Sequence, residues 1–161
     1  MEDMREIRSG NLRIGASTTI ETYLLPDIIA EFKQEYPKVD IGLYITNTQE
    51  ISDGLLKNNI DIGLVEGKVV VEELETMNLW EDKLIIISSP NKKWGEKIGR
   101  KNLEKETFFL RRKGSGSRKT YEDAMGIRDK NVFVFGGTEA IKRAVIKDLG
   151  VACVSKLTIG E

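Results

Sequence analysis

The sequence predicts an α/β fold built from two lobes. Residues 12–45 contain an apolar strand, a polar turn, an amphipathic helix and a second strand, which together form the unit of a parallel sheet with a right-handed crossover. A second run of strands and helices follows Pro90, where the composition becomes rich in Lys and Gly. We therefore expect a first lobe over residues 11–88 and a second lobe over residues 89–154.

Composition limits the function. The 161 residues are 40% apolar and 32% charged, which is a globular balance. A net charge of −1 argues against an autonomous nucleic-acid-binding domain, because such domains usually carry a basic surplus. Histidine is absent, so a Ser-His-Asp triad is impossible, and the single Cys153 excludes a thiolate metal cluster. With no cofactor motif present either, we predict no enzyme, no metal site and no cofactor, and we interpret Cys153 as a buried structural thiol.

Two features of the sequence bear on location. The N-terminus is charged and does not resemble a signal peptide. No stretch approaches the roughly 18 apolar residues of a membrane span. We therefore expect a cytoplasmic protein with no membrane association.

Two prolines and an apolar stripe define the first long helix. Pro26 fits its first turn, where a missing N–H costs little, and Pro37 ends it because proline disfavours helical geometry in the preceding residue. Residues 16–20 before it form a polar turn. Residues 39–45 after it alternate apolar and polar side chains, as in a strand with two unlike faces. The apolar stripe, spaced i, i+3, i+4, i+7 and i+11, consists of Leu25, Ile28, Ile29, Phe32 and Tyr36.

The rest of the first lobe continues the alternation of helices and strands. Either Asn47 or Thr48 caps a short helix, and Glu50 completes a capping-box-like pattern. Residues 60–65 predict a third strand. The apolar run at residues 84–87 predicts a buried strand.

The second lobe repeats the pattern of strand, glycine turn and helix. Residues 108–110 and 131–135 predict strands, and residues 151–154 predict the last one. The final helix is predicted to be capped by Thr138 and closed by Gly150. Its predicted buried face consists of Ile141, Ala144 and Val145.

Four segments share one design, in which a strand ends, hydroxyl or glycine residues follow, and a helix begins. Each offers free backbone N–H groups and the positive end of a helix dipole, which together bind anions. Taken singly, each residue is better explained as an ordinary helix cap. Taken together, they predict a site for a small polar, anionic molecule in a cleft between the lobes. The candidate residues are Ser17, Thr18, Thr19, Thr48, Ser115, Ser117 and Thr138.

Charged residues near these segments leave alternatives open. Glu66, at the end of a strand, either contacts a ligand amine or, as we prefer, is a solvated turn residue. A basic run around the glycine turn at residues 114–117 is either a solvated turn or a source of one arginine that pairs with a ligand carboxylate through its bidentate fork. That run consists of Arg111, Arg112, Lys113, Arg118 and Lys119.

An ordered series of motifs covers residues 10–156. The opening LRIGAS-x-T-x-x-x-YLLP is followed by IDIGLVEG at residues 60–67 and by LRRKGSGSR at residues 110–118. The last motif is GTEAIK at residues 137–142, with LGV at residues 149–151. The series resembles the effector-binding domain of LysR-type transcriptional regulators.

The resemblance implies a fold and partners. The implied fold has two Rossmann-like lobes joined by crossover strands, as in type 2 periplasmic-binding proteins, with a small-molecule effector in the cleft. Effectors of the family are often carboxylates or oxyanions, and its domains pair into homodimers. Residues 1–10 match a linker remnant. Residues 155–161 match the start of a segment that returns to the first lobe, so we expect that lobe to be incomplete.

The resulting interpretation is a ligand-sensing domain that makes no chemical change. DNA would be contacted only through a winged helix-turn-helix domain, which this sequence lacks. The alternative is a solute-binding protein of a transporter, which shares the two-lobe architecture. A two-lobe enzyme is a third possibility, and the lack of histidine and of a cofactor motif argues against it.

Overall fold

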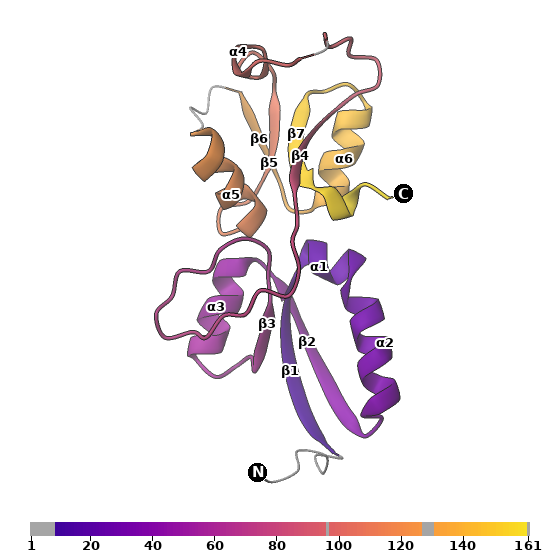
Figure 1. Ribbon diagram of the computed structural model, residues 1–161, viewed down its shortest axis with the longest axis vertical. Helices are drawn as coiled ribbons and strands as arrows, with labels where there is room; N and C mark the ends of the chain where they lie inside the picture. The colour runs from indigo at the N-terminus through magenta and orange to yellow at the C-terminus, as the bar shows by residue number, and fades with distance from the viewer. Residues whose placement is uncertain (1–8, 96, 127–130, 161) are drawn as a thin grey trace. The chain divides into compact units, whose positions relative to one another are not determined.

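The computed structural model describes residues 9–95, 97–126 and 131–160. By its contacts the chain divides into unit 1 (Met1–Met77) and unit 2 (Asn78–Glu161), each with its own sheet (Figure 1). Most of the predicted linker, residues 1–8, lies outside the described residues, and the first strand begins at Gly10. None of the helices in the described ranges has the length and hydropathy of a membrane span.

The sheet of unit 1 is wholly parallel, with strand order β2-β1-β3. Its strands are β1 (Gly10–Ser17), β2 (Val39–Thr46) and β3 (Ile62–Leu64), of which β3 is shorter than predicted. Ser17 pairs with Thr46 across β1 and β2, and Ala16 pairs with Leu64 across β1 and β3. The carboxyl ends of all three strands therefore lie at one edge of the sheet.

Two helices cover one face of this sheet. The predicted polar turn is partly helical, because α1 (Thr18–Tyr23) begins immediately after β1. The long helix α2 (Leu25–Glu35) has Pro26 in its first turn and stops before Pro37, as predicted. Its N-terminal residue Leu25 is fully buried and belongs to one core with three residues of β1 and α1, which are Ile14, Ala16 and Ile20.

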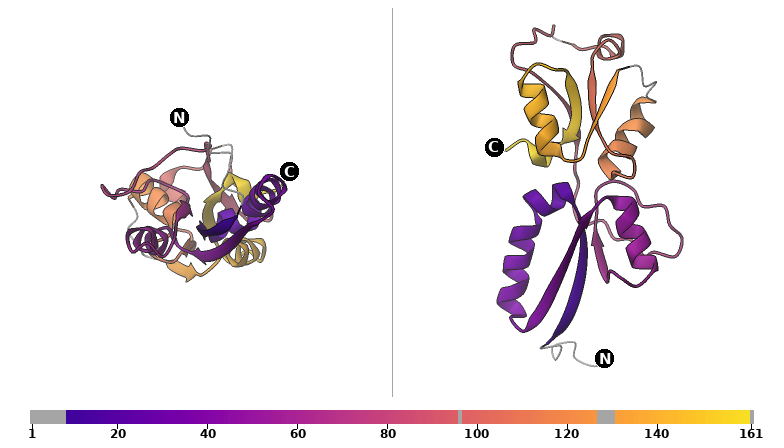
Figure 2. Two further views of the ribbon diagram at one scale, coloured as in Figure 1. Left: turned by 90° about the horizontal axis from the view of Figure 1, so that it is seen from below. Right: turned by 180° about the vertical axis from the view of Figure 1, so that it is seen from behind.

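Helix α3 (Thr48–Leu56) covers the opposite face of the unit 1 sheet (Figure 2). It lies directly against two glycines that are paired across β1 and β3, Gly15 and Gly63. A Cβ atom on Gly63 would lie 2.8 Å from Cγ2 of Ile51, and one on Gly15 would lie 3.0 Å from the same atom. Because these two glycines carry no side chains, α3 can pack close to the backbone of the sheet.

A bidentate ion pair ties β1 to the chain before β3. Arg13 Nη2 lies 2.6 Å from Asp61 Oδ1, while Arg13 Nε and the Arg13 amide both donate to Asp61 Oδ2. The Asp61 amide in turn donates to the Arg13 carbonyl. The side-chain and backbone hydrogen bonds from Arg13 lower the pKa of Asp61 from 3.8 to about 2.

This pKa makes the stability of unit 1 depend on acid pH. Because the pKa of Asp61 is lower in the folded state, its ionised form stabilises the fold above the ordinary carboxyl pKa, and this contribution is lost as pH falls towards 2. We expect Asp61→Asn to lower the thermal unfolding midpoint at pH 7, and the difference from wild type to shrink between about pH 4 and pH 2. The exposed Asp40→Asn on β2 is the control. Equal midpoints for wild type and Asp61→Asn at pH 7 would contradict the prediction.

The sheet of unit 2 is mixed, with strand order β4-β7-β5-β6. Its strands are β4 (Leu84–Ser88), β5 (Phe108–Arg111), β6 (Val132–Phe135) and β7 (Val151–Ser155). Only the pairing of β4 with β7 is antiparallel. Through this pairing β4 belongs to unit 2, whereas the sequence placed residues up to 88 in the first lobe. The 3₁₀ helix η2 (Lys156–Thr158) also belongs to unit 2, where the Lys156 amide donates to the Lys83 carbonyl.

Alternating side chains of β5 build two cores. Phe109 faces α6 (Thr138–Ile146) and packs with the predicted buried face of that helix, which is confirmed. Phe108 and Leu110 face the other way, towards Tyr121 of α5 (Gly116–Met125). The short α4 (Arg100–Leu103) adds Leu103 to this second core, and Cys153 packs against it. Burial raises the pKa of the Cys153 thiol to about 12, which fits a structural role.

The ends of α6 differ from prediction. Gly137, not Thr138, occupies the N-cap position. At the other end the left-handed conformation falls on Asp148, with φ of 60°, and not on Gly150. Gly150 has a different role, because a Cβ atom there would overlap the backbone carbonyl oxygen of Thr107. Glycine is needed at this position for the close approach of two chain segments.

Candidate functional site

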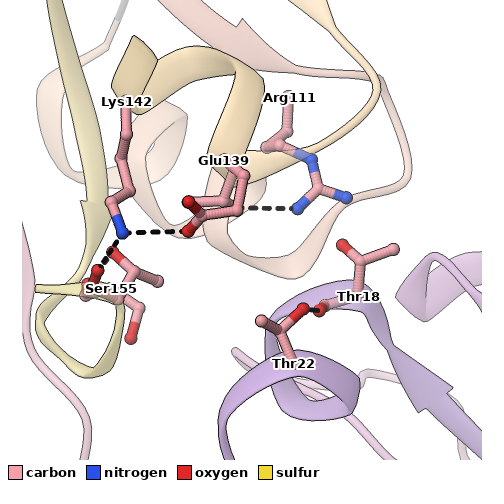
Figure 3. Close-up of polar contacts among 8 residues, drawn as sticks. Thr18, Thr22, Arg111, Glu139, Lys142 and Ser155 are labelled. Atoms are coloured by element: carbon pink, nitrogen blue, oxygen red, sulfur yellow. Dashed lines mark hydrogen bonds and ion pairs between the residues drawn. The ribbon is translucent and has the colours of Figure 1, made fainter. Parts of the chain in front are cut away.

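The first group of candidate residues follows β1. Ser17 ends the strand and caps α1, and its hydroxyl oxygen accepts a long hydrogen bond of 3.4 Å from the Ile20 amide. Ser17 and Thr19 are buried. The Thr18 carbonyl accepts a hydrogen bond from the Thr22 hydroxyl (Figure 3). The Thr18 hydroxyl oxygen is itself buried and has no hydrogen-bond partner among the described residues.

Thr48 is in an equivalent position after β2. Asn47 is the N-cap of α3, and its side-chain oxygen accepts from the Glu50 amide at 3.0 Å. The Glu50 carboxylate accepts from the Thr46 hydroxyl, so only one half of the predicted capping box forms. Because Asn47 caps the helix, the hydroxyl of Thr48 is not needed for capping. Its oxygen is buried, again with no hydrogen-bond partner in the part of the chain that the structure describes.

Glu66 completes this edge of the unit 1 sheet. It lies two residues after β3, which neighbours β1, and Gly67 turns the chain immediately after it with φ of 77°. Its Oε1 atom is buried without a hydrogen-bond partner among the described residues. The preferred interpretation of Glu66 as a solvated turn residue is therefore wrong for this oxygen. Three unsatisfied oxygens, on Thr48, Thr18 and Glu66, follow three adjacent strands.

The second group of candidates lies in unit 2, at the carboxyl edge of β5 and β6. Ser115 is the N-cap position of α5, but its hydroxyl pairs with that of Ser117 at 3.0 Å instead of capping the helix. Thr138 is the first residue of α6, and its hydroxyl accepts from Arg111 Nη1 at 3.1 Å. All four residues are buried. The register pair Arg111 and Phe135 places the two strand ends side by side.

The basic run divides into exposed and buried members. Arg112, Lys113 and Lys119 are exposed, as expected of a solvated turn. In contrast, Arg111 is only 8% exposed and Arg118 only 7%. Arg118 donates to the Arg111 carbonyl at 2.9 Å and pairs with Glu122 at 2.6 Å. Strand alternation is the sequence signal for Arg111, because it lies on the same face as the buried Phe109.

The structure thus gathers the candidates into two groups. Ser17, Thr18, Thr19 and Thr48 lie at one edge of the unit 1 sheet, and Ser115, Ser117 and Thr138 at one edge of the unit 2 sheet. Among the described residues, no cluster of His, Cys, Asp and Glu side chains forms a possible metal site. What both groups offer is hydroxyl donors, backbone N–H groups and helix N-termini.

The chain as a whole matches a known family. The family model of the LysR substrate binding domain matches residues 5–161. The chain belongs to the LysR substrate-binding domain family. The resemblance seen in the sequence motifs is therefore confirmed. Since domains of this family sense ligands without catalysing a reaction, the prediction that the chain is not an enzyme is confirmed too.

Curated relatives of this LysR domain are transcriptional regulators. The chain is 33% identical over 153 residues to the HTH-type transcriptional regulator CysL of Bacillus subtilis (strain 168), covering 91% of this chain and 51% of the relative. It is 34% identical over 166 residues to a probable RuBisCO transcriptional regulator of Cyanidium caldarium, covering 96% and 52%. The chain spans about half the length of the curated relatives it matches.

Solved structures confirm the predicted fold of the LysR domain, that of type 2 periplasmic-binding proteins. The Synechocystis PCC6803 CcmR regulatory domain in complex with 2-PG is 28% identical, with a TM-score of 0.79 over 94% of this chain and 74% of that one. The reduced regulatory domain of OxyR2 from Vibrio vulnificus is 22% identical, with a TM-score of 0.82 over 94% of this chain and 74% of that one.

Proposed function

We propose that this chain is the effector-binding part of a LysR-family transcriptional regulator and that its effector is a small anionic metabolite. The observation that carries the proposal is the pair of unsatisfied hydroxyls on Thr18 and Thr48. Buried hydroxyls are nearly always hydrogen-bonded in folded proteins, because leaving one unsatisfied is costly. Both follow adjacent parallel strands at the edge where ligands of such sheets bind.

The surrounding chemistry supports an anion. A threonine hydroxyl can donate to a ligand oxygen, and the nine-residue α3 directs the positive end of its dipole to the same edge. Within unit 2 the guanidinium of Arg111 donates to the Thr138 hydroxyl at the N-terminus of α6 and carries positive charge. The regulatory domain of CcmR, a structural neighbour, is in complex with 2-PG, a small phosphorylated acid. The proposed contact residues are the seven candidates named from the sequence.

The proposed role of binding is to control transcription. A ligand shifts a conformational equilibrium only through its different affinity for the two states. We propose that the effector favours one arrangement of the regulator, which a separate helix-turn-helix domain reads at the DNA. Such a regulator works in the cytoplasm of the cell. Membership of the LysR family favours this role over the transporter alternative.

We also propose that the domain pairs as a homodimer. The edge strands β2 and β6 both carry large apolar side chains that are exposed, and an exposed apolar edge strand is a common site of pairing between chains. The residues are Leu43 and Tyr44 on β2, and Phe133 and Val134 on β6. Light scattering of the purified chain tests the proposal, since a monomeric mass at micromolar concentration would contradict it.

Paired threonine variants test the effector site. We expect Thr18→Val and Thr48→Val to raise the stability of the ligand-free protein by about 1 kcal/mol each, because a methyl group replaces an unsatisfied buried hydroxyl. The same variants are expected to bind the effector about tenfold more weakly, since one hydrogen bond to it is lost. The measurement is thermal unfolding with and without sulfate, phosphate, acetate, citrate and 2-phosphoglycolate.

A matched control and a clear negative outcome complete this test. The exposed Thr76→Val should change neither quantity. A bound anion at about 100 times its Kd should stabilise the wild type by about 2.7 kcal/mol, a shift of several degrees. If the two valine variants lose stability and keep the full anion response, the hydroxyls are structural and the proposed site is wrong.

A further inference from the structure

Glu66 adds a carboxylate acceptor to the edge of the unit 1 sheet that also carries the two threonine hydroxyls. An ionised carboxylate is an acceptor only, so its buried Oε1 atom needs a donor. Neither unsatisfied threonine hydroxyl donates to it, although both follow strands at the same edge. Such an oxygen is costly for the ligand-free protein, because it has lost its contact with water without gaining a partner.

The strand register puts Glu66 at the same edge of the sheet as the threonines. Thr18 and Glu66 each lie two residues beyond the register pair of Ala16 and Leu64, just after the ends of neighbouring strands. Adjacent strands are about 4.8 Å apart, which is within the span of a small metabolite. A ligand held by the hydroxyls of Thr18 and Thr48 would therefore place its next substituent near Glu66.

We infer that Glu66 accepts a hydrogen bond from a hydroxyl or ammonium group of the effector, which makes the effector a hydroxy acid or amino acid and not a bare oxyanion. This inference rests on the proposed function and deepens it. A carboxylate beside an anion site repels a ligand that has negative charge alone. It favours one that presents a donor next to its acidic group, and the selectivity expected from a hydrogen bond to a charged group is roughly tenfold or more.

Two matched series of compounds test this selectivity by calorimetry. Succinate, malate and aspartate share one skeleton with hydrogen, hydroxyl and ammonium substituents, while 2-phosphoglycolate and 2-phosphoglycerate differ by a hydroxymethyl group. We expect the wild type to prefer the donor-bearing member of whichever series it binds by about tenfold or more. In Glu66→Gln the preference should fall to about twofold, with binding of the donor-free member unchanged or tighter. The exposed Glu72→Gln and Glu73→Gln serve as controls.

A ligand-free measurement keeps the inference testable whatever the effector is. Glu66→Met fills a similar volume without the unsatisfied oxygen, so its thermal midpoint should lie above that of the wild type. A lower midpoint would show that Glu66 is structural and would overturn the inference. So would a wild type that binds succinate or 2-phosphoglycolate as well as the donor-bearing partner, although the proposed function would then stand. If the wild type binds no anion of either panel, the proposed function itself fails.

Discussion

Replacing Gly150 by alanine is expected to destabilise unit 2 by about 3 kcal/mol, at the upper end of what added volume in a packed site costs. The new Cβ atom would overlap the Thr107 carbonyl oxygen and lie 3.0 Å from Cε2 of Phe109. That carbonyl already accepts a 2.9 Å hydrogen bond from the Val151 amide. Since the obstacle is backbone, it can move only by disturbing the pairing of β5 with β7.

Tryptophan fluorescence during urea unfolding measures this effect selectively. Both tryptophans, Trp80 and Trp94, belong to unit 2. The control is Gly95→Ala, because a Cβ atom at Gly95 meets nothing within 4 Å. A Gly150→Ala protein that unfolds within about 0.5 kcal/mol of the wild type would show that the close approach is unimportant for stability.

Ile51→Ala is expected to destabilise unit 1 by about 4 kcal/mol, within the range measured for truncating a fully buried aliphatic side chain. Ile51 is 0% exposed and lies between α3 and the backbone of Gly15 and Gly63. Glycines have no side chains that could relax into the space left behind. The cavity should therefore persist, and a persistent cavity makes such substitutions costly.

Because unit 1 contains no tryptophan, hydrogen exchange of the β1 amides is the suitable measurement for Ile51→Ala. The matched control is Leu56→Ala on the same helix, where the side chain is 46% exposed and the expected cost is below about 1 kcal/mol. Equal loss of protection in both variants would indicate that helix propensity, and not the packed contact, determines the result.

The parts of the fold that the sequence predicted well are those specified by periodicity. The buried face of α6 follows from residue spacing alone, and the prolines set the ends of α2. Of the predicted stripe of α2, Leu25 and Ile29 pack into the core. The boundary between the units could not be found in this way. It depends on β4 pairing with β7, which is distant in the chain, and no local composition reveals a distant partner.

Cap assignments show why the site was predicted only in part. Hydroxyl residues at a strand end can either cap a helix or remain available, and spacing alone does not distinguish the two. Asn47 caps α3, so the Thr48 hydroxyl stays without a hydrogen-bond partner among the described residues. Gly137 occupies the N-cap position of α6, so the Thr138 hydroxyl is available to accept a hydrogen bond from Arg111. The burial of Glu66 Oε1 likewise depends on how the chain turns after β3, and a single glutamate in a turn gives no sign of it.

The pairing of β4 with β7 also has a consequence during translation. The strands of unit 1 all lie within residues 10–64, so its sheet can form as soon as that segment leaves the ribosome. Leu84 of β4 must wait for Ser155, roughly 70 residues later. At about 5–20 residues per second this delay is on the order of 4 to 14 seconds. Throughout it the nascent chain displays Ile85, Ile86 and Ile87 without their sheet partner, and an unpaired apolar strand of this kind is prone to aggregate.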